Sequence, residues 1–167
     1  MRRIDPQSGE LSAEDTELYS LATRERPTNP PPNPPGLPGD WQAVEAPVIV
    51  HHGDYYYLFV SWDLCCRGLK SNYRTMVGRS RNITGPYVDG SGKSLLSKVA
   101  EHHCWWGTLA GREPRGESVL QQPDGHIIVF HAYDGKSGKP WLQISSLKWT
   151  DGWPHAALGD GSIATAK

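Results

Sequence analysis

The feature that most constrains the fold is a regular alternation of short apolar runs and turn signals, which begins after Trp41. Runs rich in Val, Ile, Tyr, Phe and Trp are separated by Gly, Asp and Pro, a pattern typical of antiparallel strands joined by hairpins. It predicts six strands: Ala46–His51, Tyr55–Trp62, Arg74–Ser80, Ser118–Gln121, His126–Asp134 and Trp141–Lys148. One arrangement occurs twice, around Gly53-Asp54 and around Asp124-Gly125. A strand is followed by a turn that contains Asp and Gly, and then by a strand rich in aromatic residues. This repeat favours the antiparallel blades of a β-propeller over a helical or βαβ fold.

The composition agrees with short strands and tight turns. The 167 residues suffice for one domain and include 18 Gly, 14 Pro, 7 Trp and 7 Tyr. Residues 27–39 are dense in proline, which predicts an extended loop within a single domain, 1–167. Ahead of this loop, Ser12 could cap a short helical turn, and residues 18–21 could equally form a strand.

The charge excludes two classes of partner. The formal net charge of -1 leaves no electrostatic footprint for nucleic acid or an anionic membrane. No apolar run approaches the roughly 18 residues of a membrane span, and residues 1–6 lack the apolar region of a signal peptide. The chain as given therefore reads as cytoplasmic, but a longer precursor could carry a leader, so its localisation stays open.

The cysteines predict neither a disulfide framework nor a metal site. Their number is odd, and two of the three, Cys65 and Cys66, are adjacent. No Cys-x-x-Cys pair is present. Cys104 follows His102 and His103, but neighbouring side chains on a strand point to opposite faces and rarely share one tetrahedral ion.

One carboxylate stands out. Glu45 lies at the mouth of an apolar strand, beside a second strand that is rich in aromatic residues. Pro47 is expected at the strand start, where its missing N–H removes no ladder bond. Partial burial of a carboxyl in such a place favours its protonated form, so Glu45 is a candidate general acid. The alternative is a solvated glutamate at a strand entrance.

Several motifs, taken in order, resemble one enzyme family. They are Val44–Pro47, Tyr55–Gly68, Val77–Ser80, Ile83–Tyr87, Gly116–Val119, His131–Asp134 and Asp151–Pro154. Together they look like glycoside hydrolase family 43, in the branch of the arabinan endo-1,5-alpha-L-arabinanases. The opening residues also resemble the segment just before the family's acid. The resemblance covers nearly the whole chain except roughly residues 97–115, and its strength lies in the combination of motifs.

The resemblance implies a five-bladed β-propeller that hydrolyses alpha-1,5-linked arabinan with inversion. The family uses an Asp base, an orienting Asp and a Glu acid. Only the acid carries over, at Glu45, because the two aspartates would lie upstream of Arg3. Asp5 matches a later turn of the family instead. The chain is thus expected to hold the last two or three blades and to be inactive if it acts alone.

The resemblance also suggests residues around the acid. Trp62 is a candidate sugar platform, and Asp63 and Arg67 are candidate substrate binders. The alternative is a structural loop with a buried Cys65 or Cys66. Arg79 and His131 are expected to brace the blade centre, and Trp149 and Trp153 to pack the last strand.

A calcium ion is implied for many family members but is doubtful here. The position of the His that helps to hold it falls close to Gly116. The neighbouring Glu117 is expected to be a surface carboxylate. No other cofactor is predicted.

Residues 98–115 depart from the family. Where it has a Gly-Gly-Gly-Thr turn and a Leu-rich strand, the chain contains His102, His103 and Cys104. Back-translation read one base earlier can restore the family pattern, so we hypothesise a local reading-frame shift that ends before Gly116. Codons that cannot encode those residues in the shifted frame would contradict the hypothesis.

Three accounts of the chain remain open at this point. It could be a fragment of a longer arabinan hydrolase, a half completed by a partner, or a non-catalytic carbohydrate-binding remnant. Exposed blade edges could also pair in a homodimer.

Overall fold

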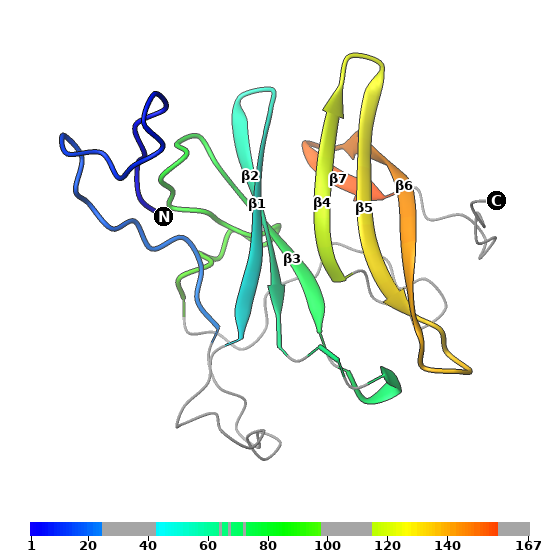
Figure 1. The fold of residues 1–167 in the computed structure, drawn as a ribbon. Coiled ribbons are helices and arrows are strands. Elements are labelled where there is room, and N and C mark those ends of the chain that lie inside the picture. Colours follow the sequence, from blue (N-terminus) through cyan, green and yellow to red (C-terminus); the bar gives the residue numbers. More distant parts are fainter. Residues whose placement is uncertain (25–42, 64, 67, 72, 98–114, 157–167) are drawn as a thin grey trace, which may run out of the picture.

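Two antiparallel sheets make up the computed structural model, which describes residues 1–24, 43–63, 65–66, 68–71, 73–97 and 115–156 (Figure 1). The first sheet has the order β1 (Val44–His52), β2 (Tyr55–Trp62), β3 (Arg74–Ser80). The second has the order β4 (Arg115–Gln122), β5 (Gly125–Tyr133), β6 (Pro140–Thr150), β7 (Trp153–Ala156). A short 3-10 helix, η1, spans Gly68–Lys70. The all-β, antiparallel prediction is confirmed.

The described residues contain no helix that is long and apolar enough to span a membrane. The proline-rich loop 27–39 lies outside the described part of the chain. So do residues 98–114 of the hypothesised frame shift, which include His102, His103 and Cys104. Cys65 and Cys66 are free thiols.

The hairpin pattern located most strands well. β2 and β3 have the predicted bounds, and β1, β4, β5 and β6 differ by a few residues at their ends. β7 was not predicted. The signal was nevertheless present: Asp151 and Gly152 both have positive φ, 52° and 72°, as a two-residue type I′ hairpin turn requires.

Pro47 is not at a strand start, so that expectation was wrong. The register of β1 on β2 shifts between Glu45, which pairs with Ser61, and Val48, which pairs with Phe59. Two residues of β1 therefore face one residue of β2, which is a β-bulge. Ala46 has a φ of 51° there. Pro47 is tolerated inside the strand because the bulge interrupts the ladder bonds.

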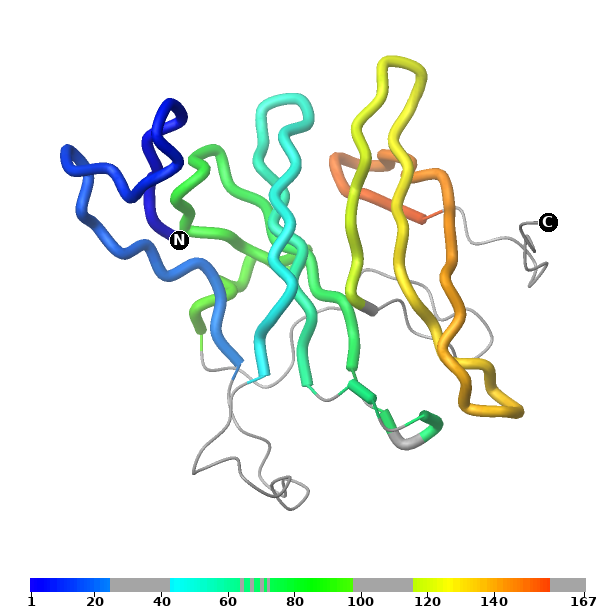
Figure 2. Tube along the Cα trace, viewed as in Figure 1, coloured from blue at the N-terminus to red at the C-terminus, as the bar shows by residue number. Residues whose placement is uncertain are grey.

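The N-terminal segment forms neither the helical turn nor the strand that the sequence allowed. Ser12 Oγ accepts hydrogen bonds from the N–H groups of Glu14 and Asp15 in a local turn, at 3.2 Å each. Leu21 and Ala22 pack on the first sheet. Figure 2 shows this segment running beside the first sheet and the residues that follow β3.

Gly78 permits a close approach on the same side. A Cβ at this position would lie 2.5 Å from Leu95 Cδ1. Because Gly has no side chain, Leu95 can reach the sheet, where it is fully buried with Met76 and Tyr87.

The main core lies between the two sheets. It combines residues of β1, β2 and β3 with residues of β5, β6 and β7: Val50, Tyr57, Phe59, Val77, Ile128, Phe130, Ala132, Leu147 and Trp153. Burial of apolar area between stacked sheets stabilises them by about 25 cal/mol per Å².

Aromatic and polar contacts link the two sheets at the end of this core beside β7. Trp149 stacks on His52, with ring centroids 3.9 Å apart. The Arg79 guanidinium lies 4.5 Å from the Trp153 ring centroid and donates to the Gly152 carbonyl oxygen at 2.8 Å. Arg79 thus braces the two sheets, and both tryptophans pack the last strands as predicted.

We expect Phe59→Ala to lower the free energy of unfolding by about 3–5 kcal/mol, because it opens a cavity between the sheets. Phe59 is fully buried, whereas Ile83 is 45% exposed. The matched control Ile83→Ala should change stability by less than about 0.5 kcal/mol. Urea denaturation measures both values, and equal losses would contradict this core assignment.

Candidate active site

The candidate site is a row of side chains that crosses the first sheet. Glu45 of β1 pairs with Ser61 of β2, and Ser61 pairs with Thr75 of β3. Directly opposed residues share one face of a sheet, with Cβ atoms about 5 Å apart. The row lies where β1 and β3 begin and β2 ends. The start of β4 adds Glu117 to it, so four strands from two sheets converge there.

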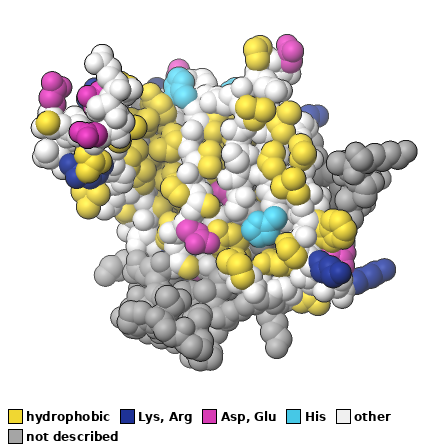
Figure 3. All heavy atoms as spheres, in the orientation of Figure 1, with side chains coloured by type: hydrophobic (Ala, Val, Ile, Leu, Met, Phe, Trp, Pro, Cys, Tyr) yellow, Lys and Arg dark blue, Asp and Glu magenta, His cyan; other side chains and the backbone are white. Residues whose placement is uncertain are grey.

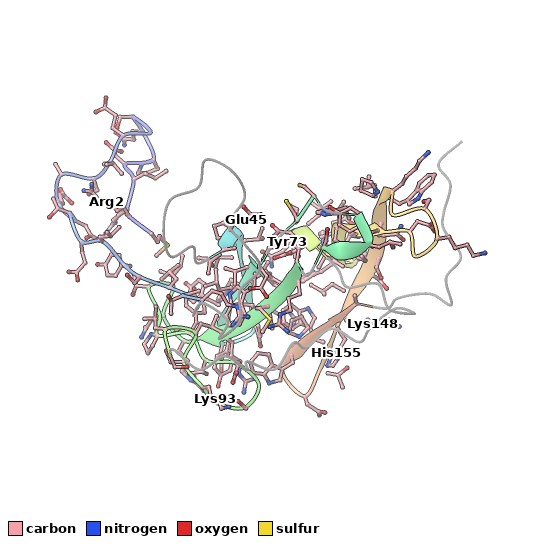
Figure 4. The ribbon with its side chains drawn as sticks, turned by 90° about the horizontal axis from the view of Figure 1, so that it is seen from below. Arg2, Glu45, Tyr73, Lys93, Lys148 and His155 are labelled. Carbon is pink, nitrogen blue, oxygen red and sulfur yellow. The ribbon has the colours of Figure 1, made fainter. Side chains whose placement is uncertain are left out.

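Glu45 is the exposed member of the row. Its side chain is solvent-accessible, so the partial burial expected from the sequence is not present in the described structure. The physical reason is the bulge, where Ala46 turns to positive φ and Pro47 leaves the ladder. Figure 4 looks onto this end of the strands and shows Glu45 beside Tyr73, with which it interacts.

Tyr73 is a site residue that the sequence interpretation missed, because it lies in a loop just before β3. It is 3% exposed and stacks against His131, with ring centroids 6.1 Å apart and an interplanar angle of 20°. Burial raises the pKa of Tyr73, a hydrogen bond with Ser61 opposes that rise, and a hydrogen bond with Glu45 adds to it. The hydroxyl is therefore a neutral donor within reach of the Glu45 carboxylate.

Cys65 borders the same place. Burial raises the pKa of its thiol to about 11, with smaller contributions from Cys66 and from the charge of Glu45. The thiol is therefore protonated and unreactive near neutral pH.

Glu117 was expected on the surface, and that expectation was wrong. It is 3% exposed. Its Oε2 accepts hydrogen bonds from Thr75 Oγ1 at 2.6 Å and from Ser61 Oγ at 3.1 Å. Burial raises its pKa, and the hydrogen bonds from Thr75, its own backbone and Ser61 only partly offset this rise. The bonds tie β4 to the first sheet, and desolvation favours the neutral carboxyl.

Trp62 and Asp63 are buried rather than presented to a ligand. Trp62 is 1% exposed, and the Arg24 guanidinium lies 4.8 Å from its ring centroid. Arg24 Nε donates to Asp63 Oδ1 at 2.8 Å, and Arg74 Nε lies 3.7 Å from Asp63 Oδ2. In this geometry the expected sugar platform is covered, because Trp62 packs with Leu58, Val60 and Leu95 on the face of the first sheet opposite to the row. Arg67 lies outside the described residues.

Calcium does not fit the described donors. Gly116, at the expected position of the family's His, donates its N–H to Ser61 Oγ at 3.2 Å. A Cβ at Gly116 would lie 3.1 Å from His131 Nδ1, so the space for a ligating side chain is already filled. Within the described ranges, no group of three or more His, Cys, Asp or Glu side chains could hold a metal ion.

The chain also matches a known protein family. The sequence profile of the glycosyl hydrolases family 43 matches residues 2–154. The chain belongs to glycosyl hydrolase family 43.

Curated relatives of this family 43 chain are arabinan-degrading enzymes. It is 41% identical over 143 residues to the extracellular endo-alpha-(1->5)-L-arabinanase 1 of Bacillus subtilis, covering 82% of this chain and 38% of the relative. It is 38% identical over 154 residues to the extracellular exo-alpha-(1->5)-L-arabinofuranosidase ArbA of Cellvibrio japonicus, covering 86% and 40%. The resemblance to the arabinanase branch is therefore confirmed.

Solved structures that resemble the chain are also arabinanases. An alpha-L-arabinanase of Cellvibrio cellulosa complexed with arabinohexaose matches with a TM-score of 0.71 and 31% identity, covering 92% of this chain and 47% of that one. The family 43 endo-arabinanase of Bacillus licheniformis matches with a TM-score of 0.65 and 37% identity, over 92% and 47%. This family 43 chain thus spans less than half the length of these relatives.

Glu117→Gln should remove a pH-dependent contribution to the stability of the family 43 chain. The folded-state pKa of Glu117 is raised above its ordinary value of 4.5. The stability that depends on the neutral carboxyl is thus fully present below that value and is lost as pH rises through the folded-state pKa. Urea denaturation at a series of pH values should show the variant gaining on the wild type as pH rises, and parallel curves would contradict a neutral Glu117.

Arg24→Met should destabilise the family 43 chain by about 3–5 kcal/mol, because it leaves the Asp63 carboxylate buried without its closest cation. Asn tolerates the positive φ of 70° at position 63. The double variant Arg24→Met with Asp63→Asn should therefore recover at least half of the loss. If the double variant loses as much unfolding free energy as the two single variants together, the ion pair between Arg24 and Asp63 is contradicted.

Proposed function

We propose that this family 43 chain carries the general-acid side of a site that hydrolyses alpha-1,5-linked arabinan. The observation that carries the proposal is Glu45, an accessible carboxyl held by a bulge at the end of a rigid sheet. Its relatives are named as arabinan-degrading enzymes, and one was solved with arabinohexaose. In this role Glu45 protonates the leaving glycosidic oxygen.

The proposed reaction inverts the anomeric centre. An inverting enzyme needs a second carboxylate, about 6.5–9.5 Å from the acid, to activate a water molecule. Glu117 does not suit that task, because it is buried and bound by Ser61 and Thr75. The base and the orienting carboxylate are proposed to come from the part of the family fold that precedes this chain's match.

Two neighbouring groups face the Glu45 carboxyl. The Tyr73 hydroxyl lies beside it, and the charge of Glu45 contributes to the raised pKa of the half-buried Cys65 thiol. A sugar seated on Glu45 would exclude water from the exposed carboxyl, and a hydrogen bond to the glycosidic oxygen is stronger in such a dry site than in water.

We propose that the two sheets are neighbouring blades of a five-bladed propeller that the chain forms only in part. The lengths support this proposal, because 92% of the chain matches 47% of a solved arabinanase. The N-terminal segment would then be the last part of the blade before β1.

A second function fits the same observations. The chain spans 38–47% of its relatives, and the second carboxyl of the described site is buried. A carbohydrate-binding protein without turnover is therefore the alternative proposal.

Glu45→Gln should lower the release of reducing sugar from linear arabinan by about 10²–10⁴-fold. The effect should be much smaller on 4-nitrophenyl alpha-L-arabinofuranoside, because this leaving group departs without protonation. Both rates are measured on the purified chain in the presence of the preceding part of a family 43 arabinanase, which would supply the proposed base.

Glu14→Gln is the matched control, because Glu14 is an exposed glutamate in the N-terminal turn and should leave both rates unchanged. Equal losses on the two substrates would contradict a general-acid role. No release from wild type, together with binding of arabinohexaose, would contradict the hydrolase and support the alternative.

A further inference from the structure

Tyr73 is held in one orientation beside Glu45. Its ring stacks against His131, with ring centroids 6.1 Å apart and an interplanar angle of 20°, and only 3% of the residue is exposed. Its hydroxyl is in hydrogen-bond contact with Ser61 and with Glu45. A buried, stacked ring has few rotamers open to it, so this hydroxyl meets the Glu45 carboxyl from a fixed direction.

The residues that hold Tyr73 are themselves held by contacts between the two sheets. Ser61 Oγ donates to Glu117 Oε2 at 3.1 Å and accepts from the Gly116 N–H at 3.2 Å. Gly116 also leaves the space that His131 occupies, since a Cβ there would lie 3.1 Å from His131 Nδ1. The support of Tyr73 is therefore complete within the first sheet and β4–β5, as a preorganised site requires.

Glu45 lies at the surface and has more freedom. Its side chain is exposed on the bulge of β1, and Figure 3 shows an acidic side chain near the lower end of β1, close to a histidine. An exposed glutamate samples many rotamers. Proton transfer requires one in which the donor oxygen lies within about 3 Å of the acceptor. The rigid hydroxyl of Tyr73 is a group against which that rotamer can be selected.

We propose that Tyr73 is a positioning residue for Glu45: its hydroxyl binds one oxygen of the carboxyl and turns the other, which carries the proton, toward the leaving glycosidic oxygen. This inference rests on the proposed function. As the bond from the anomeric carbon to that oxygen breaks, the oxygen takes the proton and Glu45 becomes a carboxylate. The hydrogen bond from Tyr73 is then charge-assisted, so it strengthens in the transition state.

Burial suits Tyr73 to this task. Desolvation raises the pKa of its hydroxyl, so the group keeps its own proton and remains a donor near neutral pH. Cys65 also borders Glu45, but a thiol is a weak hydrogen-bond donor. Tyr73 is therefore the better candidate of the two for orienting the carboxyl.

The test is the rate of sugar release by Tyr73→Phe, with the chain supplemented by the preceding part of a family 43 arabinanase. Phe keeps the ring that stacks on His131 and removes only the hydroxyl. The rate on linear arabinan should fall by about tenfold or more. The rate on 4-nitrophenyl alpha-L-arabinofuranoside should stay within about twofold, because this leaving group departs without protonation. An equal fall on both substrates would overturn the positioning role.

Tyr87→Phe is the matched control. Tyr87 is fully buried, and its hydroxyl donates to the Ile83 carbonyl oxygen at 2.8 Å. It packs with Leu58 and Met76 on the face of the first sheet opposite to the row. This variant also loses a bonded tyrosine hydroxyl, but the ratio of the two rates should not change.

A double-variant cycle measures the contact without any activity. Urea denaturation gives the unfolding equilibrium constants of Tyr73→Phe, Glu45→Ala and the double variant. The two single effects should exceed the double effect by about threefold or more when they are combined, because each single change removes the same hydrogen bond. The cycle of Glu45→Ala with Tyr87→Phe should be additive. Additive effects of Tyr73→Phe and Glu45→Ala would overturn the inference.

Glu45→Gln separates this inference from the proposed function. If Glu45→Gln lowers the arabinan rate selectively and Tyr73→Phe does not, the general-acid role stands and the positioning role is wrong. If Glu45→Gln changes the two rates equally, the general-acid role is wrong and the positioning role falls with it.

Discussion

Face-to-face packing of the two sheets is the constraint on which the rest of the structure depends. Phe59 and Phe130 meet between sheets that share no backbone ladder, so side-chain burial holds them together. Polar side chains link the two sheets at both ends of this packed core. Glu117 joins Ser61 and Thr75 at one end, and Arg79 and Tyr57 bind the Gly152 carbonyl oxygen at the other.

The site follows from this packing. Glu117 can sit beside the row from Glu45 to Thr75 only because β4 stacks on the first sheet at that point. The same stacking buries Tyr73 against His131 and so places a neutral hydroxyl next to Glu45. The acid is exposed at the bulge of β1, where an apolar groove opens between the N-terminal segment and the first sheet.

Local patterns predicted the hairpins because a hairpin is decided by a turn and by alternation over a few residues. The bounds of β2 and β3 follow from their apolar runs and flanking turns, and β7 could have been found from Asp151-Gly152. The bulge at Pro47 could not be located in this way, since it depends on which residue of β2 faces Glu45. Burial of Trp62 under Arg24 was equally hidden, because 38 residues separate the two.

By itself, the sequence determined the all-β class, most of the strands, the family and Glu45 as the candidate acid, because these depend on short motifs and on the periodicity of neighbouring residues. Only the tertiary structure decided which polar residues are buried. It turned Glu117 from an expected surface carboxylate into a buried, hydrogen-bonded link between the sheets, and it made Asp63 the partner of Arg24. Desolvation and pairing depend on segments far apart in the chain, and no local pattern records which segments will meet.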